Sequence, residues 1–576
     1  MKAFWQSFFA TILAIVVTAS VVVGIVVSKS DSKKKIEDRS WLVVDLYGSI
    51  DEYDPPAGIL GAVGGGGETL QRVLGNLEKA AVDKRVEGVV VKISGSNGAG
   101  PAMLEEMRGA IRKVRGAGKK VHCWSDDMNR NAYYLASACD SIWLAPPAYV
   151  QFIGMGSGSM HLKGTLEKLG IKPNLHKIKE YKAAAEMFTR ADMSPEAREN
   201  DVWILEERWS MFVKALGEDR GLTEEKIVEI MSLAVMTADE ARENGLADGV
   251  IYWNELERKL VHKAGEDLRT ISQSTYAGVK PEKVGLKGKK KIAVIHAHGL
   301  IGGRTSRIDP LFGVMMGHET VIADLRAAAK DKDVAAIVFR VDSPGGEGLA
   351  SDLIGHEVAV VSETKPVVAS MVDVAASGGY YISYQASKIV ADPMTITGSI
   401  GSISMKFNMK GLYDKIGVTQ DVVTKGPMAL LMSDYRDFTP EERARFEQNH
   451  WDGFNQWLED VAKRRGMTIE EATALSYGRV WSGRQAKENG LVDELGGLDR
   501  SIEIAKELAK IPADEKVSVV HYPKKKGLLE ILTGDGGGIA AAATYAAHRF
   551  VREDLAGTWR MLNGNNLYIT ESSAAR

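Results

Sequence analysis

The chain contains two copies of one sequence pattern, and this internal repeat constrains its fold more than any single motif. The stretch "YYLASACDSIWLAPPAYVQFIGMGS" from Tyr133 matches "YYISYQASKIVADPMTITGSIGSIS" from Tyr380 at an offset of 247 residues. Further along, "ARENGLAD" matches "AKENGLVD" at an offset of 245, so a two-residue insertion or deletion lies between. A repeat of this length indicates two units of one fold. We expect the copies over residues 41–285 and 291–523, joined by the exposed linker "GLKGKKK" (285–291).

Each copy alternates short apolar runs with amphipathic stretches. In the second copy "VAAIVFRVDS" (334–343) and "KPVVASMVDV" (365–374) have the pattern of buried strands, and the residues between them have helical spacing. Strands that alternate with helices form βαβ units around a mostly parallel sheet. We therefore expect an α/β fold with two tandem domains. A chain of 576 residues, 45% of them hydrophobic, is long enough for more than one core.

The N-terminal segment is of a different kind. No residue from Ala3 to Ser28 is charged, and about 20 helical residues cross the ~30 Å hydrocarbon layer of a bilayer. A cleaved signal peptide would have a shorter apolar region that ends at a small-residue site. We therefore expect a transmembrane signal anchor over residues 4–28. More lysines follow this span than precede it, so a simple positive-inside count would keep the body cytoplasmic.

Composition argues against several classes of function. A formal net charge of −3 gives no basic footprint for nucleic-acid binding. The two cysteines, Cys123 and Cys139, are too few for a disulfide framework or a metal cluster, and we expect two buried free thiols. The stretch "HEVAV" lacks the closing histidine of a zinc motif, and no glycine loop ends in GK[ST]. We therefore expect no metal, no nucleotide cofactor and no nucleic-acid partner.

A candidate nucleophile lies in the second copy, where "VDVAASGGYY" passes from a predicted strand into a predicted helix. Ser377 is at this turn, on the ligand edge of a parallel sheet and near the positive end of a helix dipole. A second glycine turn, "DSPGG" (342–346), ends the preceding strand. Amides of Gly345 or Gly346 and of Gly378 could together bind an oxyanion. The alternative is that Ser377 serves only as the N-cap of the helix.

A serine nucleophile needs a general base. His356 and His318 are nearby in the sequence, but nothing around either of them indicates an orienting carboxylate, which favours surface histidines. The other possibility is a lysine made neutral by burial, because desolvation lowers its pKa. Lys182 and Lys179 in the first copy and Lys425 in the second are the candidates, and periodicity alone does not separate them.

The duplication points to a site shared between the copies. In the first copy Ser377 corresponds to Arg130, and the two glycines after it correspond to Asn131-Ala132, so the nucleophile is missing there. That copy carries "KEYKAAAEMF" with Lys182, whereas the matching residues 427–429 of the second copy include no lysine. If both groups are needed, the second copy supplies the serine and the first copy supplies the lysine.

These motifs resemble those of the signal peptide peptidase A (SppA) family in its long, duplicated form, which comprises serine–lysine proteases of the Clp-protease/crotonase-like fold. The second copy carries "DSPGG", "ASGGYY" and "TITGSIGSI" in the family's order, and "EYKAAAEMF" is similar to the family's lysine motif. The resemblance extends from the anchor to about residue 523 and departs at Met187, where we expect proline. It implies Ser377 as nucleophile, Lys182 as general base and the glycine amides as oxyanion hole.

The resemblance also implies a location, a substrate class and an assembly. The body would lie on the periplasmic side of the inner membrane, against the charge count, and would degrade signal-peptide remnants and other short or unfolded peptides. A homotetramer shaped like a dome would enclose the sites. Two rival interpretations remain, a crotonase-like acyl-CoA enzyme and a non-catalytic membrane scaffold. The glycine- and alanine-rich C-terminal extension (524–576) receives no function.

Overall fold

The computed structural model describes residues 36–48, 50–53, 68–95, 98–261, 265–309 and 312–524. The predicted anchor (4–28) lies outside these residues, as does the predicted extension after Lys524. Within the described ranges, no helix combines the length and the apolar character needed to cross a membrane.

The first copy folds around a seven-stranded sheet in the order β10-β1-β4-β5-β6-β8, with β9 beside β6. The β6–β8 pair is antiparallel and the other pairs are parallel. The strands are β1 (Ser40–Tyr47), β4 (Val86–Ser94), β5 (Lys120–Asn129), β6 (Ser141–Gln151), β8 (Val235–Thr237), β9 (Gly249–Val250) and β10 (Thr270–Ser272). Short β2 (Ile50–Asp51) and β3 (Glu68–Thr69) pair apart from it.

The second copy repeats this plan in an eight-stranded sheet of order β20-β18-β16-β15-β11-β22, with β17 beside β16 and β21 beside β17. Here the β18–β20 pair is the antiparallel one. The strands are β11 (Lys290–His298), β15 (Val334–Ser343), β16 (Val367–Ala376), β17 (Lys388–Ala391), β18 (Ile396–Gly398), β20 (Val480–Ser482), β21 (Glu494–Leu495) and β22 (Val517–Tyr522). A small sheet joins β12 (Leu300–Ile301), β13 (Arg307–Asp309) and β14 (Gly313–Met316). The predicted α/β class with mostly parallel sheets is confirmed.

Helices cover both faces of the second sheet, which is why its central strands are apolar throughout. Along β15, Ile337 and Phe339 pack on one face beneath α13 (His318–Lys330) and α14 (Gly348–Ser362). Ala336 and Val338 alternate with them and pack on the other face with side chains of α20 (Leu498–Leu508). Successive side chains of a strand point to opposite faces, so a strand buried on both sides shows no polar alternation.

The remaining helices lie between these strands along the chain. In the first copy they are α3 (Leu70–Val82), α4 (Pro101–Gly116), α5 (Arg130–Ala136), α6 (Lys163–Leu169), η1 (Ala183–Ala185), α7 (Glu186–Thr189), α8 (Pro195–Arg220), α9 (Glu224–Met231), α10 (Ala238–Glu243), α11 (Trp253–Leu260), α12 (Gln273–Ala277) and η2 (Pro281–Val284). In the second they are α15 (Gly378–Ser383), α16 (Lys410–Ile416), α17 (Pro440–Arg465), α18 (Ile469–Ala474) and α19 (Gly483–Glu488).

The two longest helices, α8 and α17, show how the sequence sets their ends. Each has 26 residues and starts with proline after a capping side chain, Ser194 or Thr439, which accepts an amide of the first turn. Each ends at a glycine with a φ of 66°. A hydroxyl N-cap, proline at the first position and a left-handed glycine at the end are the usual limits of a helix.

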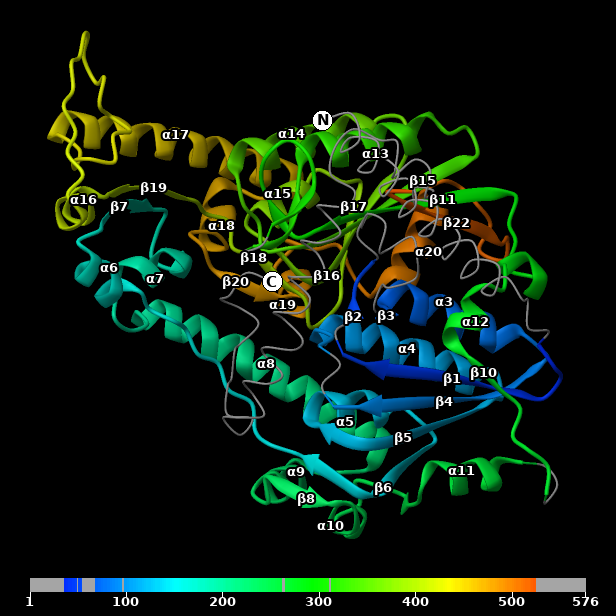
Figure 1. Cartoon of the computed structure of the whole chain (residues 1–576). Helices are drawn as coiled ribbons and strands as arrows, with labels where there is room; N and C mark the ends of the chain where they lie inside the picture. The colour runs from blue at the N-terminus through cyan, green and yellow to red at the C-terminus, as the bar shows by residue number, and fades with distance from the viewer. Residues whose placement is uncertain are drawn as a thin grey trace, which may run out of the picture.

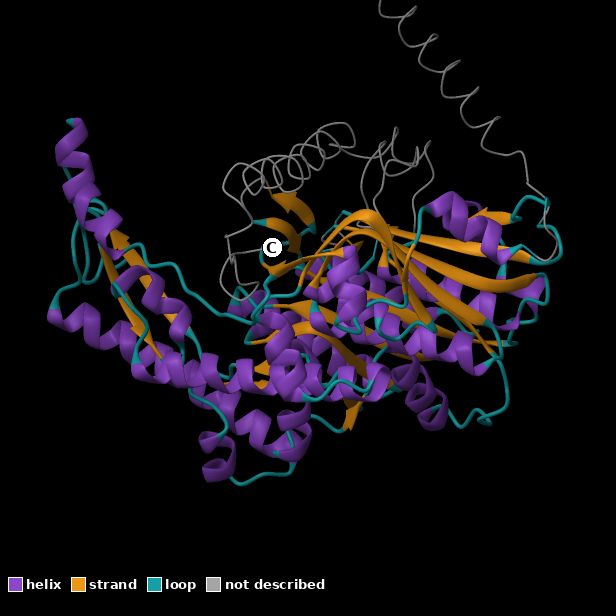
Figure 2. Ribbon diagram, turned by 90° about the horizontal axis from the view of Figure 1, so that it is seen from below, coloured by secondary structure: helices purple, strands orange, loops and turns teal. Residues whose placement is uncertain are grey.

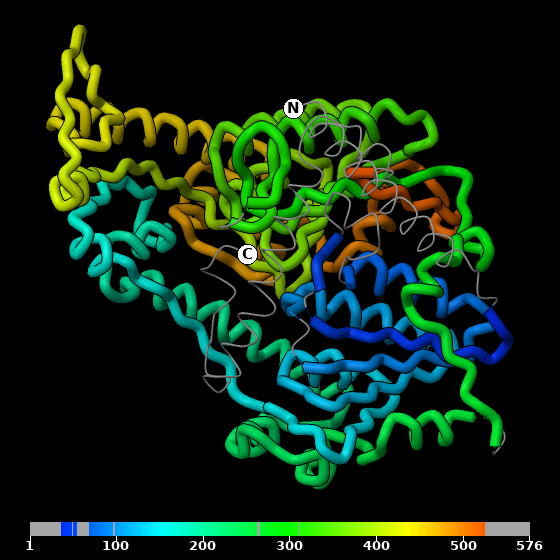
Figure 3. Tube along the Cα trace, viewed as in Figure 1, coloured from blue at the N-terminus to red at the C-terminus, as the bar shows by residue number. Residues whose placement is uncertain are grey.

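The two copies lie side by side, and each contributes one strand to a projecting arm (Figures 1, 2 and 3). In this arm β7 (Lys172–Lys177) of the first copy pairs antiparallel with β19 (Ile403–Asn408) of the second. Gly170 and Gly411 allow the two backbone segments to come into contact there, because a Cβ on Gly411 would lie 2.4 Å from the Gly170 carbonyl oxygen. The β7–β19 pair therefore carries the residues that follow β7 onto the second copy.

Candidate active site

Ser377 lies at the turn between β16 and α15, as the sequence predicts. Its backbone has φ 56° and ψ −118°, a region that residues with a Cβ rarely occupy. Within the part of the chain that the structure describes, its hydroxyl makes no capping hydrogen bond to the helix. The interpretation of Ser377 as a helix cap alone therefore fails, and the strained turn directs the hydroxyl elsewhere.

The partner of this hydroxyl is Lys182, whose Nζ lies 2.9 Å from Ser377 Oγ. The lysine side chain is buried, with 6% of the residue exposed. Burial lowers the pKa of Lys182 to about 7, because an ammonium without water or a carboxylate partner is disfavoured. A substantial fraction of this lysine is therefore a neutral amine near neutral pH.

Ser399 holds the lysine from the other side. Lys182 Nζ donates to the Ser399 carbonyl oxygen at 2.9 Å and to Ser399 Oγ at 3.0 Å. Ser399 belongs to the "TITGSIGSI" stretch and has a positive φ of 50°. No sequence prediction names Ser399, and its place in that stretch is the one signal that points to it.

The backbone around Lys182 is fixed by the second copy. The Ile178 amide donates to the Ser402 carbonyl at 3.0 Å, directly beyond the β7–β19 pair. Gly478, with a φ of 90°, lies so close to Lys182 that a Cβ on Gly478 would be 2.4 Å from the backbone nitrogen of Lys182. The lysine therefore belongs to the first copy but is placed by contacts with the second.

The other candidate bases lie elsewhere. Lys179 Nζ is 4.3 Å from the centroid of the Tyr477 ring, in a cation–π contact. Lys425 is exposed, and so is His356 on α14. His318 is half-buried and its ring bonds a backbone carbonyl at 2.9 Å. Among the described residues, Lys182 is thus the candidate that contacts Ser377.

The glycine turns bring two amides close to the serine. Gly345 donates its amide to Ser343 Oγ at 3.2 Å. In the described part of the chain, the amides of Gly346 and Gly378 have no acceptor. A Cβ on Gly378 would lie 3.1 Å from the Gly346 nitrogen, so these two groups are neighbours. Gly346 and Gly378 therefore offer two unused N–H donors beside Ser377.

The equivalent positions of the repeat carry no such pair. Arg130 begins α5 and donates to the carbonyl of Gly154 at 2.6 Å. Residues 427–429 lie in an exposed loop of the second copy. Within the described residues, the candidate nucleophile and the candidate base of one chain thus meet once, with one group from each copy.

The cysteines and the acidic side chains take no part in this arrangement. Cys123 and Cys139 are buried free thiols, as predicted, and burial raises the pKa of both. In the described ranges, no cluster of three or more His, Cys, Asp or Glu side chains is suited to hold a metal ion.

Comparison with known proteins identifies the family. The model of peptidase family S49 matches residues 113–267 and 359–512, one segment in each copy. The chloroplastic serine protease SPPA of Arabidopsis thaliana is 33% identical over 88% of this chain and 75% of its own length.

Two bacterial proteins are similar as well. Protease 4 of Salmonella typhi is 32% identical over 82% of this chain and 79% of its own length. A putative signal peptide peptidase SppA of Enterococcus faecium is 30% identical over 45% of this chain and 77% of its own. This chain therefore belongs to peptidase family S49 and is a serine protease.

Proposed function

We propose that this protein is an endopeptidase in which Ser377 is the nucleophile and Lys182 the general base. The observation that carries the proposal is the 2.9 Å contact between Lys182 Nζ and Ser377 Oγ, made by a buried lysine. Membership of a peptidase family speaks against the two rivals, an acyl-CoA enzyme and a scaffold.

The reaction begins when the neutral amine of Lys182 takes the proton of Ser377 as Oγ attacks a peptide carbonyl carbon. The amides of Gly346 and Gly378 stabilise the oxyanion of the tetrahedral intermediate. Lys182 then gives its proton to the leaving nitrogen, the C–N bond breaks, and an acyl-enzyme remains. Lys182 next takes a proton from water as the water oxygen attacks the acyl carbon, the bond between that carbon and Ser377 Oγ breaks, and the proton passes from Lys182 to Oγ. Gly345 is the poorer oxyanion donor of the two adjacent glycines, because its amide already bonds Ser343.

Ser399 aligns the base in this scheme. A lysine ammonium has three N–H donors, and three oxygens surround Nζ, two from Ser399 and one from Ser377. When the amine is neutral, the two Ser399 acceptors hold its two hydrogens and the lone pair faces Ser377. The geometry thus selects the orientation in which the amine can accept the serine proton.

The proposed substrates are remnant signal peptides and other short or unfolded peptides. The similarity to the putative signal peptide peptidase SppA of Enterococcus faecium supports this class. A fluorophosphonate should label Ser377 and no other serine, and the protein should cleave a signal-peptide-like fluorogenic peptide faster than a folded protein. Peptide cleavage that survives Ser377→Ala would show that the nucleophile is misassigned.

The activity should depend on pH through Lys182. The amine must be neutral to act as a base, and its pKa is lowered to about 7. We therefore expect kcat/KM to rise about tenfold per pH unit below 7 and to level off above it. A series of peptide-hydrolysis rates from pH 5 to 9 measures this profile. A flat profile, or a midpoint near the usual lysine value, would contradict a neutral buried base.

The anchor, the location and the assembly are further parts of the proposal. Residues 4–28 would hold the body on the periplasmic side of the inner (cytoplasmic) membrane, supported by the uncharged run and the family resemblance. The repeats 41–285 and 291–523 would act as the lysine and serine domains of a homotetramer. Cleavage by a protease added to the periplasm tests the location, and sedimentation of the detergent-solubilised protein tests the assembly. A body protected from that protease, or a monomer, would reject the corresponding part.

A further inference from the structure

The residue before the proposed base, Tyr181, belongs to a polar group that joins the two copies. Arg479, the residue directly before β20, donates to Tyr181 Oη at 2.7 Å and to Glu199 at 2.6 Å. Tyr181 Oη donates to the second oxygen of Glu199 at 3.0 Å. The three side chains thus close a ring of hydrogen bonds, and Arg479 is its member from the second copy.

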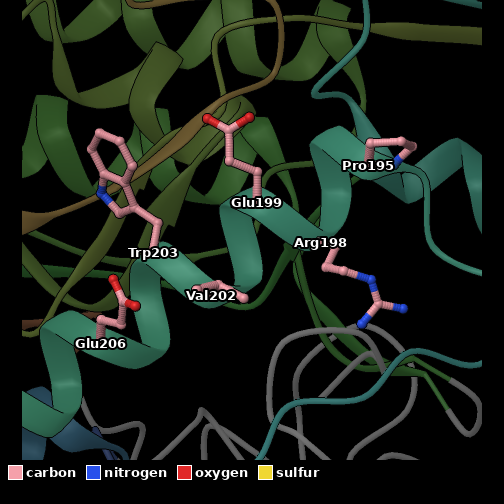
Figure 4. Close-up of a pocket in the computed structure, with 6 residues that line it drawn as sticks. All are labelled: Pro195, Arg198, Glu199, Val202, Trp203 and Glu206. Atoms are coloured by element: carbon pink, nitrogen blue, oxygen red, sulfur yellow. The ribbon is translucent and has the colours of Figure 1, made fainter.

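Aromatic rings surround the guanidinium. Its carbon lies 4.3 Å from the centroid of Tyr181, 5.3 Å from that of Trp203 and 5.4 Å from that of Trp481. Trp203 and Trp481 meet edge to face with centroids 5.2 Å apart. Glu199 and Trp203 project from one side of α8, four residues apart (Figure 4). We call these five residues the Arg479 cluster: Arg479, Tyr181, Glu199, Trp203 and Trp481.

The ion pair between Arg479 and Glu199 is too solvated to act mainly as a source of stability. A cavity of about 440 Å³ on this face of α8 is lined by Glu199 and Trp203, among others (Figure 4). Half of the Glu199 side chain is exposed, and ion pairs at such positions contribute little free energy of folding. What the cluster does provide is geometry, because a planar guanidinium stacked between rings has few orientations.

Arg479 is connected to the proposed active site in two ways, through its backbone and through its side chain. The Arg479 carbonyl accepts the Ser399 amide at 2.8 Å, and the preceding Gly478 packs against the Lys182 backbone. The Arg479 side chain holds Tyr181, which is covalently joined to Lys182. Arg479 therefore connects the segment that carries Lys182 with Ser399, the residue that aligns Lys182.

We infer that Arg479 is a positioning residue for Lys182, acting through Tyr181 and Glu199. The inference rests on the proposed function, in which Lys182 is the general base. Without the cluster, the segment around Tyr181 can move away from Ser399 and admit water to Nζ. Water would raise the pKa of Lys182 toward its ordinary value and lengthen the contact with Ser377.

The test compares Arg479→Gln with a matched arginine. Arg484 also joins α8 to the second copy, by two contacts of 2.5 and 2.6 Å with Glu207, but it does not belong to the Arg479 cluster. Arg479→Gln is expected to lower kcat about 10- to 100-fold, the cost of a misplaced catalytic group, with KM within about twofold. The acid limb of its kcat/KM profile should move to higher pH. Arg484→Gln should keep both kcat and the midpoint of the wild type.

A second variant keeps the test decisive. Tyr181→Phe retains the ring and removes the hydroxyl, so it should shift the profile in the same direction by a smaller amount. Because the two residues act together, the double variant should be no slower than Arg479→Gln alone. If circular dichroism shows that Arg479→Gln does not fold, the kcat/KM–pH profile of Tyr181→Phe decides whether the inference holds.

Two outcomes overturn the inference. One is a wild-type kcat and pH midpoint in Arg479→Gln, or in Tyr181→Phe where it decides. The other is an equal loss of kcat in Arg484→Gln, which would make general docking of α8 the cause. An active Lys182→Ala enzyme would instead reject the proposed function. An inactive Lys182→Ala enzyme beside an unaltered Arg479→Gln enzyme would reject this inference alone.

Discussion

Replacing Lys182 by alanine is expected to lower kcat/KM at least about 1,000-fold, near the upper end of what a general base contributes. The substitution removes the amine 2.9 Å from Ser377 Oγ and leaves no other base in contact with that hydroxyl among the described residues. The loss should fall on kcat rather than on KM, because the amine acts in the transition state. Hydrolysis of a fluorogenic signal-peptide-like substrate measures both constants, and the rate of fluorophosphonate labelling reports acylation directly.

Lys179→Ala is the matched control. This lysine is three residues away in the same segment, but its Nζ lies over the Tyr477 and Trp451 rings. The variant should keep at least half of the wild-type kcat/KM and the same pH midpoint. Equal losses in the two lysine variants would mean that the segment, and not the amine of Lys182, is what catalysis needs.

The two proposed catalytic residues differ in how the sequence marks them. Ser377 is marked locally, at a strand-to-helix turn followed by glycines, whereas Lys182 is distinguished from Lys179 and Lys425 only by the resemblance of "EYKAAAEMF" to the family's lysine motif. The comparison of the two copies then indicated that the groups meet between them. The structure brings them together within one chain, which sequence alone did not decide.

The supporting residues were not predictable, since their roles depend on contacts far apart in the sequence. The choice between Gly345 and Gly346 depends on which amide the Ser343 hydroxyl occupies. Arg479 is 298 residues from Tyr181, and no local pattern links them. Each of these contacts exists only after the two copies have docked.

The strands of the fold also differ in how well the sequence predicts them. Apolar runs predicted the central strands β15 and β16, because burial on both faces leaves a clear signal. The antiparallel β7–β19 pair carries no such signal, since most of its side chains are half-buried or exposed. That pair is nevertheless what carries Lys182 to Ser377.

The docking of the two copies also depends on a buried charge, Arg340 of β15. Its guanidinium, with a side chain 1% exposed, binds Glu52 at 3.0 Å and Glu106 at 2.6 Å, and both carboxylates come from the first copy. A third contact of 3.1 Å goes to Ser370 Oγ. Burial alone would raise the pKa of Glu52, but His296 and Arg340 hold it well below its usual range. Glu52 is therefore an anion that needs its partners.

Arg340→Met is expected to destabilise the protein by about 3–5 kcal/mol, because it leaves the buried Glu106 without its cation and the buried Glu52 with His296 as its remaining partner. Arg326 offers the matched control: it binds Glu357 with two contacts of 3.0 and 2.6 Å, yet 60% of its side chain is exposed. Arg326→Met should cost much less than Arg340→Met, because its guanidinium is exposed to solvent. Urea unfolding followed by tryptophan fluorescence gives both values.

The pH dependence separates a missing cation from a packing defect. Unpaired buried carboxylates should take up protons, since burial raises their pKa, so the penalty of Arg340→Met should shrink as the pH falls from 8 to 5. Adding Glu52→Gln and Glu106→Gln should recover part of the loss at pH 8, because neutral amides then replace the two buried carboxylates. A penalty that is equal for Arg340→Met and Arg326→Met, or independent of pH, would mean that this buried arginine does not hold the two copies together through its charge.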